Sequence, residues 1–194
     1  IRLERQLWIA VMRAQQELGI SIPKGIPEKY EAVIDTVNLE SIAERERVTK
    51  HDVKARIEEF NDLAGAEHIH LGMTSRDLTE NVEQLQIRLS LILIRDKSIA
   101  ALDRLSGLAV AYSELAMAGR SHNVAAQITT LGKRMATFAE ELLFAVERLE
   151  ELIDAYPLRG IKGPVGTAQD MHTLLNGNAE ALLALESRVA AHLG

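Results

Sequence analysis

The sequence contains no cysteine. This absence excludes a disulfide framework, a thiolate metal site and a cysteine nucleophile, and it is consistent with a reducing compartment. No apolar run reaches the length of a membrane span: the longest candidate, residues 89–94, is bounded by Arg88 and Arg95. We therefore expect a cytoplasmic protein without a membrane partner.

Proline and aromatic residues are also scarce. There are four prolines in 194 residues and 4% aromatic residues, although 47% of the chain is hydrophobic. An interior of Leu, Ile, Val and Ala suits long helices packed side by side better than a β-sandwich. The 22 basic and 28 acidic residues give a net charge of −6. A nucleic-acid-binding protein normally carries a basic face, so we expect no nucleic-acid partner.

The first third of the chain shows the pattern of several short helices. Apolar residues recur at helical spacing over residues 3–18 and stop at Gly19. Residues 28–37, 39–48 and 52–63 continue as three more short helices. We therefore expect a small N-terminal helical domain over residues 1–72. Because the first residues resemble the middle of a helix and lack a start methionine, we expect the chain to be cut at both ends.

The rest of the chain favours long helices. Residues 77–118 contain no proline and one glycine, and a capping-box pattern at residues 77–80 marks the expected start. A helix of roughly 40 residues would span about 60 Å. The second long segment, Ile128 to Leu152, repeats apolar residues in steps of three and four, as in coiled-coil-like packing.

A second apolar stripe on that segment widens its apolar face beyond what one partner helix covers; its residues are Leu143, Val146 and Ile153. One helix that needs several partners in so short a chain indicates a homo-oligomer assembled through the helices. No stretch shows a strand pattern. We therefore expect an all-α fold in which residues 73–194 form the first part of a central bundle of long helices.

Four polar blocks interrupt the helical pattern and are the candidate functional segments. Each carries at least one cation, and converging cations can attract an anionic ligand even in an acidic chain. Thr74 and Ser75 stand just before an expected helix start, where hydroxyl and free N–H groups suit a carboxylate or phosphate. His122 stands at the expected start of another helix, where imidazole can exchange a proton near neutral pH. The blocks are residues 50–53, 68–77, 119–130 and 159–167.

Each candidate also has a purely structural interpretation. On spacing alone, His51 beside Asp52 is better explained as a surface pair near a helix start. A Thr-Ser pair is more often a helix cap than a ligand site, and His122 could equally be a buried, hydrogen-bonded histidine. The residues by themselves indicate an anion-binding helical oligomer and leave open whether it is an enzyme.

Two further patterns do not support a metal or a dinucleotide. His68 and His70 form an H-x-H pair, but no carboxylate or third histidine lies at ligand spacing, so we expect no metal. The glycines at 160, 163 and 166 are too loosely spaced for a dinucleotide fingerprint and follow no strand. A turn that joins two helices explains them as well.

Taken together and in this order, the four blocks resemble the fumarase/aspartase superfamily and, within it, the adenylosuccinate lyase family. The resemblance runs along essentially the whole chain, and four blocks in register are far more specific than one. The matching segments are Lys50-His51-Asp52-Val53, His70-Leu71-Gly72-Met73-Thr74-Ser75-Arg76-Asp77, Arg120-Ser121-His122 with Thr129-Thr130-Leu131-Gly132-Lys133-Arg134, and Arg159-Gly160-Ile161-Lys162-Gly163 with Gly166-Thr167.

The resemblance implies a carbon–nitrogen lyase of purine biosynthesis. Such an enzyme eliminates fumarate from adenylosuccinate, giving AMP, and from the succinylated aminoimidazole carboxamide ribotide, without a cofactor. It also implies a homotetramer whose active sites each combine residues from three subunits. The implied roles are general acid for His122 and substrate binding for Lys50, His51, Asp52, Thr74 and Ser75, with His70, Arg159 and Lys162 as further candidates.

The sequence departs from the family pattern in three respects. The family's base is a serine on a loop of G-S-S-x-M-P-x-K-x-N type, and no such segment occurs here, so we expect it beyond Gly194 and expect this chain alone to be inactive. Ser121 stands where many members have threonine, and Ile128 where many have proline.

Other interpretations remain open at this point. Argininosuccinate lyase and a carboxymuconate cycloisomerase-like enzyme share the superfamily, although the segment Lys50 to Val53 favours the purine enzyme. A helical scaffold that has lost its activity is a different class of alternative. A four-helix di-metal protein is the least favoured, because the E-x-x-H pairs of such sites are missing.

Overall fold

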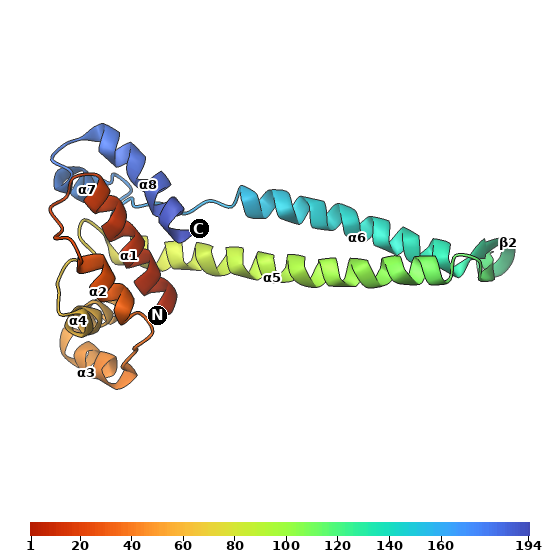
Figure 1. Cartoon of the computed structure of the whole chain (residues 1–194), viewed down its shortest axis with the longest axis horizontal. Helices are drawn as coiled ribbons and strands as arrows, with labels where there is room; N and C mark the ends of the chain where they lie inside the picture. Colours follow the sequence, from red (N-terminus) through yellow and green to blue (C-terminus); the bar gives the residue numbers. More distant parts are fainter. The chain divides into compact units, whose positions relative to one another are not determined.

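The computed structural model describes all 194 residues and consists of eight helices and one two-stranded sheet (Figure 1). The predicted all-α class is confirmed. The chain forms two compact units: residues 1–85 with 157–194, and residues 86–156. Residues 157–194 thus pack with the N-terminal part of the chain. The predicted division of the chain into residues 1–72 and 73–194 differs from these compact units. It stays a prediction about domains.

The four short helices of the first unit lie close to where the pattern predicted them. Asn38 caps α3 by accepting a hydrogen bond from the N–H of Ser41 at 3.0 Å. Gly65 ends α4 in the left-handed conformation, with φ 60°, which glycine adopts without steric cost. The helices are α1 (Arg2–Glu17), α2 (Ile26–Ala32), α3 (Leu39–Thr49) and α4 (Asp52–Ala64).

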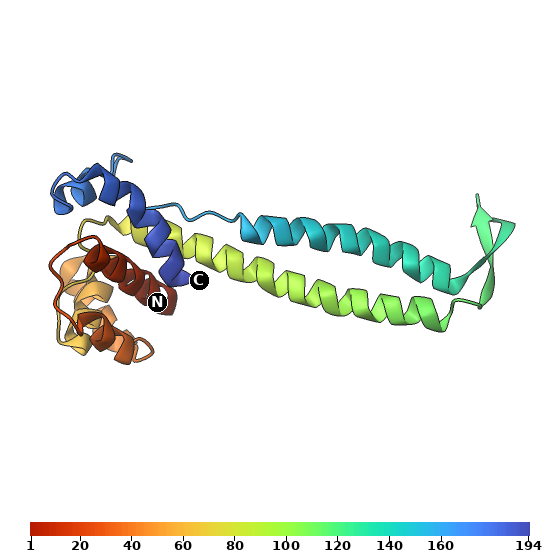
Figure 2. The ribbon, with the colours of Figure 1, turned by 45° about the horizontal axis from the view of Figure 1, so that its top comes forward.

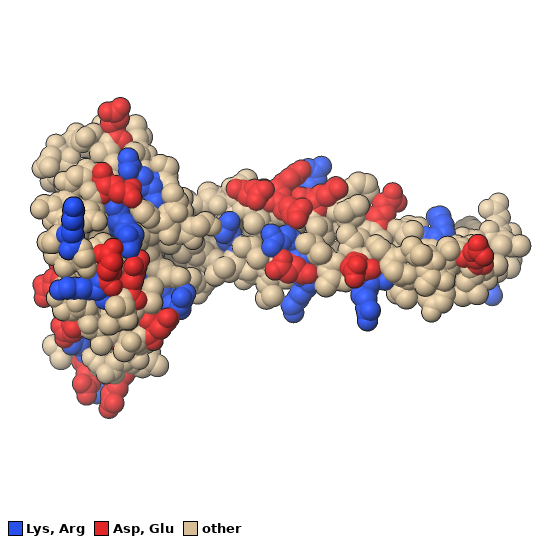
Figure 3. Space-filling view, in the orientation of Figure 1, with Lys and Arg blue, Asp and Glu red and all other residues tan.

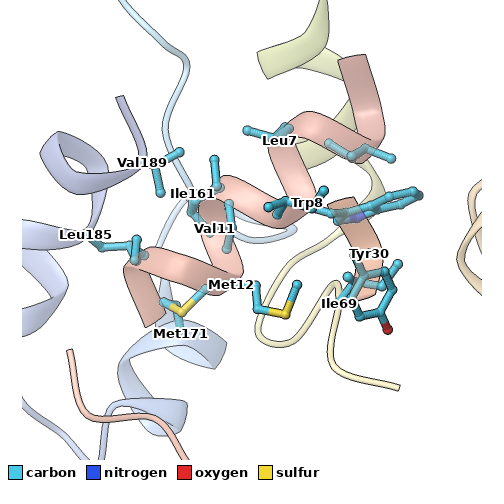
Figure 4. Packing of buried hydrophobic residues seen from close by; sticks show 14 of the residues in the cluster. Leu7, Trp8, Val11, Met12, Tyr30, Ile69, Ile161, Met171, Leu185 and Val189 are labelled. Atoms are coloured by element: carbon cyan, nitrogen blue, oxygen red, sulfur yellow. The ribbon is translucent and has the colours of Figure 1, made fainter. Parts of the chain in front are cut away.

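Helix α1 lies at the centre of this unit's core (Figure 4). Its residues Leu7, Trp8 and Met12 are almost completely buried, and a helix buried on most of its sides must be covered by several partners. One partner is α8 (Ala179–Leu193), which contributes Leu185 and Val189 to the same cluster. Full burial of one such side chain stabilises a fold by about 1.5–3 kcal/mol. The C-terminal segment is therefore an integral part of this unit.

A buried ion pair joins the first helices. The Arg5 guanidinium donates to Glu59 at 2.6 Å and to the backbone carbonyl groups of Val33 and Ile34 at 2.9 and 2.8 Å. It also lies 4.4 Å from the centre of the Phe60 ring. Because all these groups lie on α1, α4 and the segment after α2, Arg5 holds the connection between α2 and α3 against the core.

The segment after residue 157 contains one helix that the pattern did not predict, α7 (Gln169–Leu174). It lies where a helix-joining turn was expected. Helix α8 was predicted to start at Asn178, and this is confirmed: the Asn178 side chain accepts a hydrogen bond from the N–H of Ala181 at 3.0 Å.

The long helices are α5 (Ser75–Ala111) and α6 (Leu131–Asp154), and both views show α6 running back alongside α5 (Figures 1 and 2). Gly132 allows the start of α6 to touch the end of α5, because a Cβ at this position would lie 2.3 Å from the carbonyl oxygen of Ala109. The N–H of Gly132 donates to the carbonyl group of Tyr112 at 2.8 Å. Gly132, which belongs to the resembling segment Thr129 to Arg134, therefore has a packing role.

We expected no strand, but the segment between the two long helices contains two. Residues 116–121 and 124–130 form an antiparallel hairpin, β1 (Ala116–Ser121) and β2 (Val124–Thr130) (Figure 2). The two residues between the strands, His122 and Asn123, have φ values of 50° and 64°. Positive φ at both positions is what a type I′ hairpin turn requires, and asparagine tolerates it well.

The hairpin shortens both predicted long helices. α5 ends at Ala111 instead of residue 118. α6 begins at Leu131, where the Thr130 hydroxyl accepts a hydrogen bond from the N–H of Lys133 at 3.1 Å. Ile128, the first residue of the predicted seam, lies on β2 with 86% of its surface exposed.

Large apolar side chains on the long helices remain uncovered within the chain. Leu93 on α5 and Phe144 on α6 are 56% and 61% exposed. Neither helix is long and apolar enough to cross a membrane. Basic and acidic side chains are mixed over the face shown in Figure 3, and the basic ones do not gather into one surface.

Candidate functional site

Thr74 and Ser75 lie at the beginning of α5. The sequence predicts this pair at a helix start and as a ligand-binding pair. The Asp77 carboxylate accepts a hydrogen bond from the N–H of Thr74 at 2.9 Å. An acidic side chain that reaches back in this way is the second half of a capping box. The predicted box at residues 77–80 is therefore wrong by three positions, and the helix starts with Thr74 as its cap. The Ser75 hydroxyl is partly exposed beside free N–H groups of the first turn.

The side chains of His51 and Ser75 are in contact, although the two residues are 24 positions apart in the sequence. His51 Nε2 lies 3.3 Å from Ser75 Oγ. Nδ1 of the same ring caps α4 by accepting a hydrogen bond from the N–H of Lys54 at 3.2 Å. Because Nδ1 is an acceptor, the neutral ring carries its proton on Nε2 and donates it to Ser75 Oγ. The Ser75 hydroxyl proton is then free to be donated to a ligand.

Lys50 and Asp52 flank His51 and differ in their pairing. Lys50 ends α3 in the left-handed conformation, with φ 54°, and its exposed ammonium group has no partner in the chain. Asp52 pairs with Arg56 at 2.8 Å. Burial alone would raise the pKa of Asp52, but hydrogen bonds from the Val53 N–H and from Arg56 outweigh it and hold that pKa below its usual value. Lys50 is thus the free cation of this block.

Asp77 is buried and joins α5 to the loop at residues 159–163. Its carboxylate forms an ion pair with Arg159 and accepts hydrogen bonds from the N–H groups of Lys162 at 2.9 Å and Gly163 at 3.1 Å. Asn81, one turn further along α5, exchanges two hydrogen bonds of 3.0 Å with the backbone of Gly160. These contacts fix the loop against the first turns of α5.

The two cations of that loop are already paired within the chain. Arg159 binds Asp77 and also Glu80, at 2.5 Å, and the Lys162 ammonium group binds Glu186. In this structure both side chains hold the fold together. Asp77 and Asn81 were not predicted as organising residues; the only available signal was that Asp77 is the last residue of the segment that begins at His70.

His70 lies in a tight turn before Thr74, with φ 64°. Its Nδ1 is 3.0 Å from the indole nitrogen of Trp8. Burial lowers the pKa of His70 to about 4, while Asp77 raises it and His51 lowers it further. His70 is therefore neutral at physiological pH.

No three histidine, aspartate or glutamate side chains come together as metal ligands in this chain. His68 and His70 are two residues apart, and the bond to Trp8 occupies one ring nitrogen of His70. The H-x-H pair thus does not form a ligand set here.

His122 belongs to the unit of residues 86–156 and does not start a helix, contrary to expectation. It is exposed at the hairpin turn and its ring has no partner in the chain. The turn is braced by Arg120, whose guanidinium donates to the carbonyl group of Asn123 at 2.9 Å. The imidazole is therefore accessible to a ligand or another subunit.

The chain is similar to curated adenylosuccinate lyases. It is 33% identical to that of Saccharomyces cerevisiae over 195 residues, which is 98% of this chain and 40% of the relative. It is 35% identical to that of Methanocaldococcus jannaschii over 200 residues, which is 100% of this chain and 42% of the relative. The chain thus spans about two fifths of the length of these relatives.

Solved structures show the same fold. A fumarate lyase from Mesorhizobium sp. BNC1 superposes with a TM-score of 0.78 at 25% identity, covering 99% of this chain and 45% of the other. The 3-carboxy-cis,cis-muconate lactonizing enzyme from Pseudomonas putida gives a TM-score of 0.76 at 23% identity, covering 97% and 44%.

A protein-family model described as lyase matches residues 3–188. This span contains all four blocks, the His51–Ser75 contact and the His122 turn. The chain therefore belongs to this lyase family.

Proposed function

We propose that the chain is part of an adenylosuccinate lyase, which releases fumarate from adenylosuccinate and from the succinylated aminoimidazole carboxamide ribotide. The similarity to adenylosuccinate lyases along 98–100% of the chain supports the assignment. The observation that carries it is the hydrogen bond between His51 and Ser75. This bond joins two of the resembling segments into one group of hydrogen-bond donors, which suits a substrate that carries carboxylates.

The proposed reaction is a β-elimination. A base removes a proton from the carbon next to the one that bears the leaving nitrogen. The electron pair first spreads into the adjacent carboxylate, where fixed donors stabilise it. It then forms the C=C bond of fumarate as the C–N bond breaks, and the departing nitrogen takes a proton from a general acid.

The residues of this chain fit the binding and acid steps of that reaction. Thr74, Ser75 and the free N–H groups at the start of α5 would hold the succinyl carboxylates, with Ser75 oriented by His51. Lys50, which precedes His51 in the sequence, adds an unpaired positive charge to this segment. His122 would be the general acid. The base would be the family's serine, which lies outside the residues of this chain.

The proposed assembly is a homotetramer in which each active site combines residues from three subunits. The exposed apolar residues of α5 and α6, such as Leu93 and Phe144, support it. Large apolar surfaces of this kind usually mark an interface. Such an assembly would also bring His122 of one subunit to the binding groups of another.

The full-length protein is expected to release fumarate from adenylosuccinate and not from argininosuccinate. Fumarate release from each substrate, followed by its ultraviolet absorbance, tests this. Release from argininosuccinate alone would keep the elimination chemistry and overturn the purine assignment. If a protein shown to be tetrameric releases fumarate from neither substrate, the result would favour a helical scaffold that has lost its activity.

The 194-residue chain alone is expected to release no fumarate from adenylosuccinate, because the family's serine base is not among its residues. The same fumarate assay, with the full-length protein as the positive control, measures this. Turnover by the isolated chain would show that another residue serves as the base.

A further inference from the structure

Helix α1 holds the turn that precedes Thr74 and Ser75. The indole N–H of Trp8 donates to His70 Nδ1 at 3.0 Å, and the Gln15 side chain donates to the carbonyl group of Leu71 at 2.8 Å. Gly72 has φ 67°, and a Cβ there would lie 3.2 Å from Met171 on α7. Trp8 thus holds the His70 ring, while Gln15 and α7 hold the backbone of the turn.

The bond from Trp8 determines which nitrogen of His70 carries the proton. An indole N–H can only donate, so His70 Nδ1 must be an unprotonated acceptor. The neutral ring therefore carries its proton on Nε2. Protonation of Nδ1 would place two N–H groups against each other. The indole of Trp8 cannot rotate away, because Trp8 is packed in the core and only 1% exposed.

The surroundings of His70 keep this state over the physiological pH range. Burial is the main cause of its pKa of about 4. Of the titratable groups near the ring, the Asp77 carboxylate on α5 favours protonation of His70, and a positive charge on His51 before α4 would oppose it. Both of these groups also contact the Thr74–Ser75 pair, so His70 lies beside the proposed binding groups. Its Nε2–H has no partner in the chain.

We propose that Trp8 is a positioning residue: it fixes His70 as the Nε2–H tautomer, so that His70 donates a hydrogen bond to an anionic group of the substrate and transfers no proton. The tautomer rests on the geometry of α1 and the turn. The role toward substrate rests on the proposed function. The two parts can therefore fail separately.

The tautomer is tested by NMR of the full-length protein labelled with ¹⁵N at the histidine rings, the His70 signals being assigned by their loss in His70→Gln. Between pH 6 and 8 we expect an unprotonated Nδ1 and a protonated Nε2, with no titration. Trp8→Phe, which keeps an aromatic ring but removes the N–H, is expected to mix the tautomers. A protonated Nδ1, or a ring unaffected by Trp8→Phe, would overturn the assignment whatever the substrate is.

The role toward substrate is tested by steady-state kinetics with adenylosuccinate. Trp8→Phe is expected to raise KM about 3- to 10-fold, the worth of one hydrogen bond, and to change kcat less than 2-fold. Phe60→Leu is the matched control: Phe60 stacks on Trp8 with ring centres 6.2 Å apart, so its loss weakens the same core but keeps the indole N–H. It should lower Tm without raising KM. An equal rise in KM in both variants would show a merely structural role.

Two replacements of His70 separate donation from proton transfer. The amide N–H of His70→Gln can occupy roughly the place of Nε2–H, whereas His70→Leu offers no donor. We expect KM to be lower in His70→Gln than in His70→Leu by about 3-fold or more, with similar kcat in both. A fall in kcat of about 100-fold or more in both variants would identify His70 as a proton-transfer group and overturn the proposal.

Discussion

On the proposed function, replacing His122 with alanine in the full-length protein is expected to lower kcat for adenylosuccinate by about 10²- to 10⁴-fold. This is the usual contribution of a positioned general acid. The structure supports the choice of residue, because the exposed His122 ring has no partner in the chain and is presented on a braced hairpin turn. Initial rates of fumarate release at saturating substrate measure the effect.

The matched variant for this prediction is His122→Asn. Residue 122 has φ 50°, a conformation that asparagine adopts more readily than alanine. Asparagine thus keeps the turn but cannot transfer a proton. An equal loss in both variants identifies the acid. A loss in His122→Ala alone would mean that the turn matters and the imidazole does not, and near-normal rates in both would move the acid to another residue, such as His51.

Replacing Asp77 with alanine is expected to lower the free energy of unfolding by about 3–5 kcal/mol, because it breaks a buried ion pair and leaves its partners uncompensated. The carboxylate is completely buried and binds Arg159 as well as the N–H groups of Thr74, Lys162 and Gly163. Its loss would release the loop at 159–163 and the cap of α5 together. KM should therefore rise as well, since Thr74 and Ser75 lose their support.

Denaturant unfolding of the full-length protein measures this loss, with Asp103→Ala as the control. Asp103 lies on the same helix, is exposed and has no ion-pair partner, so its replacement should change stability by less than about 0.5 kcal/mol. A loss for Asp77→Ala that is no larger than for Asp103→Ala would contradict the organising role of Asp77.

The helices of the first unit could be predicted because their signals are local. Apolar residues at a period of 3.6 and terminal signals such as Asn38 and Gly65 lie within a few residues of the helix that they define. The hairpin at residues 116–130 was not predicted, because its strands carry no such local signal. Its strands are short, mostly exposed and paired only with each other, so no burial pattern marks them. The turn at His122 and Asn123 was interpreted as a polar functional block.

The candidate site was only partly visible in the sequence. The motifs identified the residue types that could bind an anion, such as Thr74 and Ser75. They did not show that His51 would orient Ser75, or that Arg159 and Lys162 would be occupied by carboxylates. Trp8 gave no signal at all, because a tryptophan on an apolar helix face is usually a core residue.

The helical class, the lyase family and the candidate segments could be inferred from the sequence alone, since these depend on periodicity and on motifs that are contiguous in the chain. Which groups are donors and which are already paired depends on the tertiary structure. Trp8 and His70 are 62 residues apart, and Asp77 and Arg159 are 82 apart. Hydrogen-bond direction and ion pairing depend on distances of about 3 Å between such groups, and only the packing of α1, α5 and the segment after residue 157 sets these distances.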